Sequence, residues 1–211
     1  MSENDALDAE ALRAALGGQR IGHRIVVLAE TTSTNDAVAQ LAAENSEGLV
    51  VFAERQTAGR GQYGRSWESS DHHGLWLSIL LRPKIPVRDS TRLTDLLARV
   101  IAATIEETTG LAASIKPLND VFIGSRKIAG VLVEMRVEAG GDYAAIAGIG
   151  INVNQAVEDF SPELRSSAGS IAMALGRAAD RGALAVALLR NLDERYDAFR
   201  QEQSKQAGRE R

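Results

Sequence analysis

The chain has 211 residues, 45% of them hydrophobic, so we expect one domain (1–211) with a real core, organised over about residues 23–200. Its 24 basic and 28 acidic residues leave a net charge of −4, which argues against broad binding to nucleic-acid phosphates. The absence of cysteine excludes disulfides, thiolate nucleophiles and cysteine-bound zinc, and it fits a cytoplasmic protein.

Apolar spacing in the first half predicts helices alternating with strands. The predicted elements are a helix over 5–16, a strand over 23–30, a helix over 34–45, strands over 49–54 and 75–81, and a long helix over 90–109. Ser33 or Thr34 is expected to cap the second helix, and Asp89 or Ser90 the third, which Gly110 should end in a left-handed conformation.

The second half predicts strands joined by turns, followed by helices. The elements are strands over 113–116 and 121–123, a hairpin of strands 127–137 and 143–153, helices near 161–176 and over 181–200, and a polar tail that frays. Hairpin-joined strands with helices between them indicate an α+β fold with a mixed, mostly antiparallel sheet. No stretch approaches the roughly 20 apolar residues of a membrane helix.

A glycine-rich stretch with two arginines, residues 59–67, is the first chemical signal. Gly59, Gly61 and Gly64 let the backbone approach a ligand closely. The guanidinium groups of Arg60 and Arg65 suit carboxylate and phosphate oxygens. Taken alone, the stretch could equally be a flexible, solvated loop.

A turn rich in polar side chains is the second signal, since Asn119 and Asp120 follow Lys116 there. A carboxylate beside an amide can hold Mg²⁺ or order a nucleotide phosphate. Lys127 could neutralise charge as it develops on a phosphate, and Gly130 leaves room for a ligand. The simpler alternative is a plain turn with a surface cation.

Two further motifs complete the pattern. Residues 32–35 place short polar side chains at a predicted helix N-terminus, where they could cradle a polar head group or merely cap the helix. Residues 148–154 combine two glycines with Asn152, whose amide offers both a donor and an acceptor.

Together the four motifs resemble those of the biotin–protein ligase family, in the family's order and over about residues 25–200. The family's Gly-Arg-Gly-x-x-Gly-Arg-x-Trp is similar to 59–67, and its Ser-Thr-Asn to 33–35. Its Lys-Trp-Pro-Asn-Asp and Arg-Lys-x-Ala-Gly-(Ile/Val)-Leu-Val-Glu motifs are similar to 116–134, and its Gly-x-Gly-Ile-Asn to 148–152. The resemblance implies a catalytic domain related in fold to class II aminoacyl-tRNA synthetases.

The resemblance implies an enzyme that forms biotinyl-5'-AMP from biotin and ATP, with Mg²⁺. The biotin is then transferred to a lysine of a biotin carboxyl carrier domain, of acetyl-CoA carboxylase or a similar carboxylase. Family members often dimerise through a sheet edge, so a homodimer is possible. Both steps build negative charge, so the site needs cations and no nucleophilic side chain.

The resemblance also implies roles for individual residues. Lys127, Arg60 and Arg65 would be catalytic, and Asp120 would contact Mg²⁺ through ATP. The residues implied for biotin are Ser33, Thr34, Asn35, Gln56, Arg60, Gly61, Gln62, Lys127 and Gly130. Those implied for ATP or the adenylate are Gly59, Arg60, Arg65, Trp67, Lys116, Asn119, Asp120 and Asn152.

The sequence departs from the family pattern at two places. Pro117-Leu118 stands where the family usually has Trp-Pro, which removes one pocket wall. Gln62 stands where arginine is common, which leaves one fewer positive charge in the loop. About 22 residues precede the first predicted strand, too few for a helix-turn-helix domain, so we expect no DNA binding. The family's C-terminal β-barrel also has no counterpart in the strand pattern.

Two other functions stay open. A lipoate or octanoate ligase or transferase would share the fold and the chemistry, although residues 59–67 are typical of biotin enzymes. A non-catalytic biotin- or nucleotide-binding protein would suit the altered 117–118 pair, whereas Lys127 and Asp120 favour an enzyme.

Overall fold

A computed structural model describes residues 6–69, 72–116, 119–138 and 143–209. Seven strands form one sheet in the order β1-β2-β3-β7-β6-β5-β4. They are β1 (Arg24–Thr31), β2 (Leu49–Gln56), β3 (Gly74–Leu81), β4 (Ser114–Lys116), β5 (Asp120–Ile123), β6 (Arg126–Val137) and β7 (Tyr143–Asn152). Only β1 and β2 pair in parallel, which confirms the mixed, mostly antiparallel sheet. The sheet edges, β1 and β4, are the candidate strands for edge-to-edge pairing.

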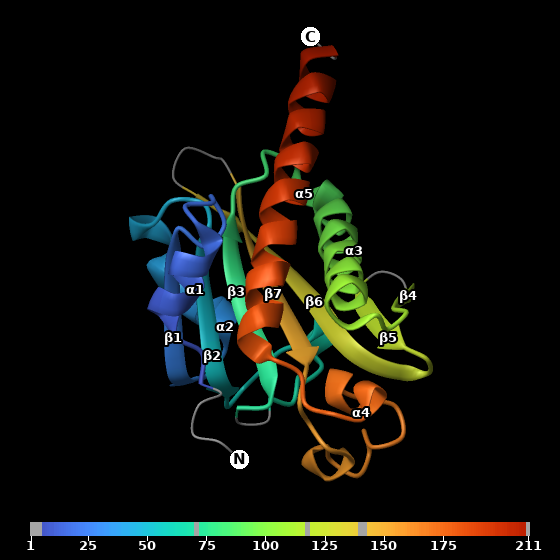
Figure 1. Ribbon diagram of the computed structural model, residues 1–211. Helices are drawn as coiled ribbons and strands as arrows, with labels where there is room; N and C mark the ends of the chain where they lie inside the picture. Colours follow the sequence, from blue (N-terminus) through green and yellow to red (C-terminus); the bar gives the residue numbers. More distant parts are fainter. Residues whose placement is uncertain (1–5, 70–71, 117–118, 139–142, 210–211) are drawn as a thin grey trace.

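The helices lie on both faces of this sheet. They are α1 (Ala9–Leu16), α2 (Thr34–Leu41), α3 (Ser90–Thr109), α4 (Ile171–Leu175) and α5 (Arg181–Arg209), with 3₁₀ turns at Ala42–Glu44, Gln62–Gly64, Val87–Asp89 and Val157–Asp159. Figure 1 shows α3 and α5 side by side on one face, with α2 on the other. Within the described residues, no helix is both long and apolar enough to cross a membrane.

Two apolar clusters explain why the central strands are almost continuously hydrophobic. On one face, Val50 and Phe52 of β2 join the large core beneath α3 and α5. On the other face, Leu49 and Val51 pack with Val38 of α2. Because β3 lies between both clusters, all eight of its residues are buried. Strands covered on both faces are expected to lose the polar alternation that is typical of exposed sheets.

The helix boundaries confirm part of the prediction. Gly110 ends α3 with a left-handed φ of 75°, as expected. Ser33 and Asp89 occupy the N-cap positions of α2 and α3, as predicted, but neither side chain makes a capping hydrogen bond. For α2 that role falls to Gln56 of β2, whose Oε1 accepts from the backbone N–H of Thr34 at 2.9 Å.

Two predictions after β7 are wrong. Residues 162–167 form turns, and only Ile171–Leu175 of the predicted 161–176 helix is helical. The tail expected to fray instead continues α5 to Arg209, and Figure 1 shows this end projecting beyond the sheet. The predicted turns at 117–118 and 139–142 lie outside the described residues.

Candidate active site

A cavity of about 350 Å³ brings the four sequence motifs together. Its walls come from the start of α2, the loop that follows β2, the beginnings of β5 and β6, and β7. The predicted site residues that line it are Ser33, Thr34, Asn35, Gln56, Arg60, Gly61, Gln62, Arg65, Trp67, Asn119, Asp120, Lys127, Gly130 and Asn152. The volume falls in the range of small-molecule sites, about 300–1,000 Å³.

Lys127, near the start of β6, supplies a positive charge to this cavity. Its Nζ lies 2.7 Å from Oδ1 of Asp120 and 5.3 Å from the ring centre of Trp67. The backbone of Lys127 is fixed as well, since its N–H donates to the Ser167 carbonyl at 2.8 Å and its carbonyl accepts from Gly169 at 3.0 Å. The ammonium therefore extends from a backbone held by hydrogen bonds to a distant segment.

Trp67 forms an aromatic wall, and glycines make room for it. A Cβ atom at Gly150 would lie 2.6 Å from the indole, and one at Gly130 would lie 2.9 Å from it. Trp67 also packs edge-on against Trp76, with ring centres 6.2 Å apart. Gly130, predicted to leave space for a ligand, lines the cavity, and the absence of its side chain also makes room for the indole.

The predicted polar cradle at the start of α2 is a buried hydrogen-bonded network. Gln56 links the backbone of Thr34 to the hydroxyl of Ser69, to which its amide donates at 2.9 Å. Ser78 of β3 lies 2.7 Å from the Thr34 hydroxyl and donates to the Asn35 side chain at 2.6 Å. No sequence motif pointed to Ser78, because it is a lone polar residue in an apolar strand.

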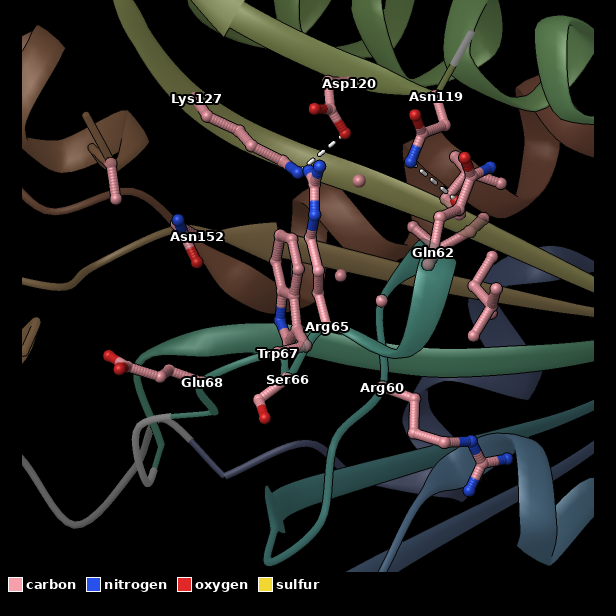
Figure 2. A pocket seen from close by; sticks show the side chains of 18 of the residues that line it. Arg60, Gln62, Arg65, Ser66, Trp67, Glu68, Asn119, Asp120, Lys127 and Asn152 are labelled. Carbon is pink, nitrogen blue, oxygen red and sulfur yellow. Dashed lines mark hydrogen bonds and ion pairs between the residues drawn. The ribbon is translucent and has the colours of Figure 1, made fainter. Parts of the chain in front are cut away.

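The two loop arginines, both predicted to face the ligand, differ in their surroundings. The Arg60 guanidinium donates to both carboxylate oxygens of Asp36, at 2.7 and 2.8 Å, and to Glu134 at 3.3 Å. The hydrogen bond from Arg60 lowers the pKa of Asp36 below its ordinary value. Within the described residues, the Arg65 side chain has no ion pair or hydrogen bond. Figure 2 shows Arg65 extending toward Lys127 and Asp120, whereas Arg60 points away from them.

Other predicted residues have structural partners. Gly59 and Lys116 do not line the cavity, and the Lys116 ammonium lies 3.9 Å from the ring centre of Phe122. The amide of Asn119 donates to the Val131 carbonyl at 3.2 Å. That of Asn152 donates to Gly169 at 2.9 Å, so Asn152 lines the cavity and anchors a neighbouring segment.

Sequence reasoning missed one wall of the cavity, formed by residues 160–168. Phe160 and Leu164 supply apolar surface, and Glu68 of the opposite loop accepts from the backbone N–H of Ser161 at 3.1 Å. This segment has no recognisable motif. Its only signal is an apolar residue at every fourth position, a spacing that predicts a helix.

The cavity thus combines apolar walls with three cations, two carboxylates and several amides. Such a site suits a small organic acid whose carboxylate or phosphate meets Lys127 and Arg65. Within the described residues, no group of three or more histidine, aspartate and glutamate side chains could hold a metal ion by itself. Asp120 could share one with a nucleotide, because Mg²⁺ is often bound through one carboxylate and substrate phosphates.

Several known proteins are similar to this chain in sequence and in fold. A bifunctional ligase/repressor, BirA, from Bacillus subtilis is 37% identical over 191 residues, 90% of this chain and 59% of the relative. A biotin–[acetyl-CoA-carboxylase] ligase from Mycobacterium tuberculosis is 34% identical over 92% of this chain and 72% of the relative. The biotin protein ligase from Aquifex aeolicus, solved with biotin and ATP, aligns with a TM-score of 0.74 and 31% identity over 84% of this chain and 72% of that one.

The chain therefore spans 59% of the length of the Bacillus relative. The profile of the biotin/lipoate A/B protein ligase family matches residues 27–154, which include the polar cradle, the glycine–arginine loop, Lys127 and the β7 glycines. From the extent of this match and the shared fold, the chain belongs to the biotin/lipoate A/B protein ligase family.

Proposed function

We propose that this chain is an ATP-dependent biotin–protein ligase. It forms biotinyl-5'-AMP and transfers the biotin to a lysine of a biotin carboxyl carrier domain, such as that of acetyl-CoA carboxylase, in the cytoplasm. The main support is the convergence of Lys127 and Arg65 on a cavity walled by Trp67 and the α2 cradle. Similar proteins are named as biotin ligases, and one of them was solved with biotin and ATP. They favour biotin over lipoate as the substrate.

In the first step, the biotin carboxylate attacks the α-phosphate of ATP, and pyrophosphate leaves. Lys127 and Arg65 neutralise the negative charge that gathers on the phosphate oxygens, which is the main task of a protein in phosphoryl chemistry. Asp120, which pairs with the Lys127 ammonium, would contact Mg²⁺ through ATP. Mg²⁺ would supply further charge neutralisation at the phosphates.

In the second step, the neutral amine of the carrier lysine attacks the acyl carbon of the adenylate, AMP leaves, and the amine loses a proton. The bond that breaks is an acid anhydride, which water would also cleave. Trp67 and the glycine–arginine loop around it cover the cavity, so they limit the access of water to this bond. Thr34, Asn35 and Gln56 provide the polar contacts for the biotin head group.

The test is to incubate the protein with biotin, ATP, Mg²⁺ and a carrier domain, and to measure the carrier by mass. We expect the carrier to gain one biotinyl group, and octanoate or lipoate to give little product. Transfer of lipoate or octanoate in preference to biotin would instead identify a lipoyl-type enzyme. Tight binding of biotin without any transfer would identify a non-catalytic binder.

The variant Lys127→Ala should reduce adenylate formation by at least about 100-fold, because one of the two charges at the phosphate is lost. Pyrophosphate release from ATP measures this step directly. Lys205→Ala, which removes an exposed lysine from α5, is the matched control and should behave as the wild type. Wild-type pyrophosphate release by Lys127→Ala, with its circular dichroism unchanged, would exclude the proposed role.

A further inference from the structure

We propose that Asp36 and Glu134 are positioning residues, which act through Arg60 to keep the glycine–arginine loop in its binding conformation before biotin arrives. This inference rests on the proposed function. It gives Arg60 a different role from that of Arg65, and it adds two acidic residues to which the sequence motifs assigned no role.

The three side chains join three separate elements into what we call the clasp, Asp36–Arg60–Glu134. Asp36 lies in the first turn of α2, Arg60 in the loop and Glu134 on β6. Arg60 binds Asp36 through two parallel hydrogen bonds of 2.7 and 2.8 Å and reaches Glu134 at 3.3 Å. Two-point contacts between guanidinium and carboxylate groups fix orientation as well as distance.

The clasp continues directly into the proposed biotin cradle. Glu134 Oε2 accepts from the side-chain amide of Asn35 at 2.6 Å, and it is the same oxygen that Arg60 approaches. Asn35 in turn accepts from Ser78. The position of the loop and the orientation of the Asn35 amide are therefore set by one shared carboxylate.

Apart from the clasp, the attachments of the loop in the described residues lie near its ends. Thr57 and Ala58 donate to the carbonyls of Thr31 and Thr32 at 2.9 Å, the Trp67 indole packs against β6 and β7, and Glu68 accepts from Ser161 at 3.1 Å. The far end of the loop is also held where Gln56 donates to Ser69. Between the two ends, the main contacts are internal, with Gly61 donating to the Arg65 carbonyl at 2.7 Å and Trp67 to that of Gly59 at 2.8 Å. Tyr63 at the tip is 88% exposed and has a left-handed φ of 59°. A loop whose middle has so few outside contacts depends strongly on each of them.

The clasp also determines which charges the ligand meets. Two carboxylates surround Arg60, and the hydrogen bond to Asp36 is the largest cause that raises the pKa of Arg60. Its charge is thus already compensated, whereas Arg65 keeps its guanidinium for an anion. Loss of the clasp would release the loop, and biotin binding would then have to order it, which weakens affinity.

The experiment compares Asp36→Asn and Glu134→Gln with Asp95→Asn. Asp95 is a matched control, because it pairs with Arg99 at 2.8 Å on the exposed side of α3, far from the cavity. We expect both clasp variants to raise the dissociation constant of biotin, measured by calorimetry without ATP, about fivefold to tenfold. Asp95→Asn should leave it within twofold, and Asp36→Glu should restore part of the affinity.

Kinetics separate positioning from a general loss of structure. The KM for biotin in pyrophosphate exchange should rise with its dissociation constant, while kcat at saturating biotin stays within about twofold of the wild type. A fall in kcat with unchanged KM, or an effect no larger than that of Asp95→Asn, would overturn the proposal. Glu134→Gln tests whether the effect of Asp36→Asn arises only from a change in α2, because Glu134 lies on β6 and not in that helix.

A second readout needs no ligand and so tests the clasp independently of the proposed function. In the ligand-free protein, trypsin should cleave after Arg60 or Arg65 several-fold faster in Asp36→Asn than in Asp95→Asn, as read by peptide mass. Equal cleavage rates would refute the clasp even if biotin binds. Failure of the wild type to bind biotin, with the difference in cleavage intact, would refute the proposed function alone.

Discussion

Individual glycines shape the floor of the cavity. Gly148 leaves room for the Asn35 side chain, whose Oδ1 would lie 2.4 Å from an added Cβ, and Gly150 does the same for Trp67. The sequence showed that these strands contain gaps, and it located Lys127 and Asp120 correctly in one pocket. It could not show which side chains fill the gaps, because those come from α2 and from the loop, far away along the chain.

Gly150→Ala should therefore disturb the aromatic wall more than the fold. The new methyl group would lie within 2.7 Å of three atoms of the indole, so Trp67 must move. We expect biotin affinity to fall about tenfold or more, and the free energy of unfolding to fall by about 1–3 kcal/mol. Calorimetry and urea unfolding measure the two effects. Gly182→Ala is the control, because the nearest atom to its added Cβ would lie at an ordinary 3.4 Å. Equal biotin affinities of the two variants would contradict the proposed role of Gly150.

Hydrophobic periodicity predicted the helices that pack against the sheet. It failed for a segment whose backbone carbonyls accept hydrogen bonds from a side chain of another element. Residues 161–168 have helical spacing, yet they do not form a helix. The Arg126 guanidinium instead donates to the carbonyls of Arg165 and Ala168, both at 2.7 Å. Carbonyls engaged in this way do not support a regular helix. The end of α5 shows the opposite case, since strong helix formers extend it beyond its last apolar contact.

A charged pair also ties the end of β3 to the end of β6. Arg82 donates to both oxygens of Glu138, at 2.7 and 2.6 Å, and this hydrogen bonding lowers the pKa of Glu138 below its ordinary value. A carboxyl group with a depressed pKa in the folded state stabilises the protein above its unfolded pKa, and that stabilisation disappears as the pH falls through the folded value.

Glu138→Gln should consequently destabilise the protein by about 1 kcal/mol at neutral pH. The difference from the wild type should stay constant down to about pH 5 and then shrink in more acidic solution, because protonation removes the same charge from the wild type. Urea unfolding at a series of pH values provides the measurement. A difference that persists unchanged at pH 3 would show that the charge of Glu138 is not its cause.

Across the whole molecule, a buried ion pair joins segments from both ends of the chain. Glu54 of β2 is 4% exposed, and it accepts from the Leu7 backbone at 2.8 Å and from Arg181, at the start of α5, at 2.5 Å. The sequence predicted the fold class and the α5 helix correctly. It gave no sign of this pair, because a charged residue at the end of a strand is usually solvated.

Arg181→Met should lower the free energy of unfolding by about 3–5 kcal/mol, since it removes the buried cation of Glu54 and leaves the carboxylate beside the half-exposed His72 ring, at 3.2 Å. The double variant Glu54→Gln/Arg181→Met should lose less than the sum of the single variants. A double-mutant cycle in urea measures this coupling. Additive losses would mean that the two side chains contribute independently.

The hydrogen bonds on both sides of the Lys127 backbone have a consequence for how such enzymes vary. Residues 167–169 run beside Lys127 like a short extra strand, so their path sets the point from which the Lys127 ammonium extends. Insertions or substitutions in this stretch can thus tune the reach of the amine while every recognisable signature stays intact. Natural or engineered differences in turnover among related chains should be sought there first.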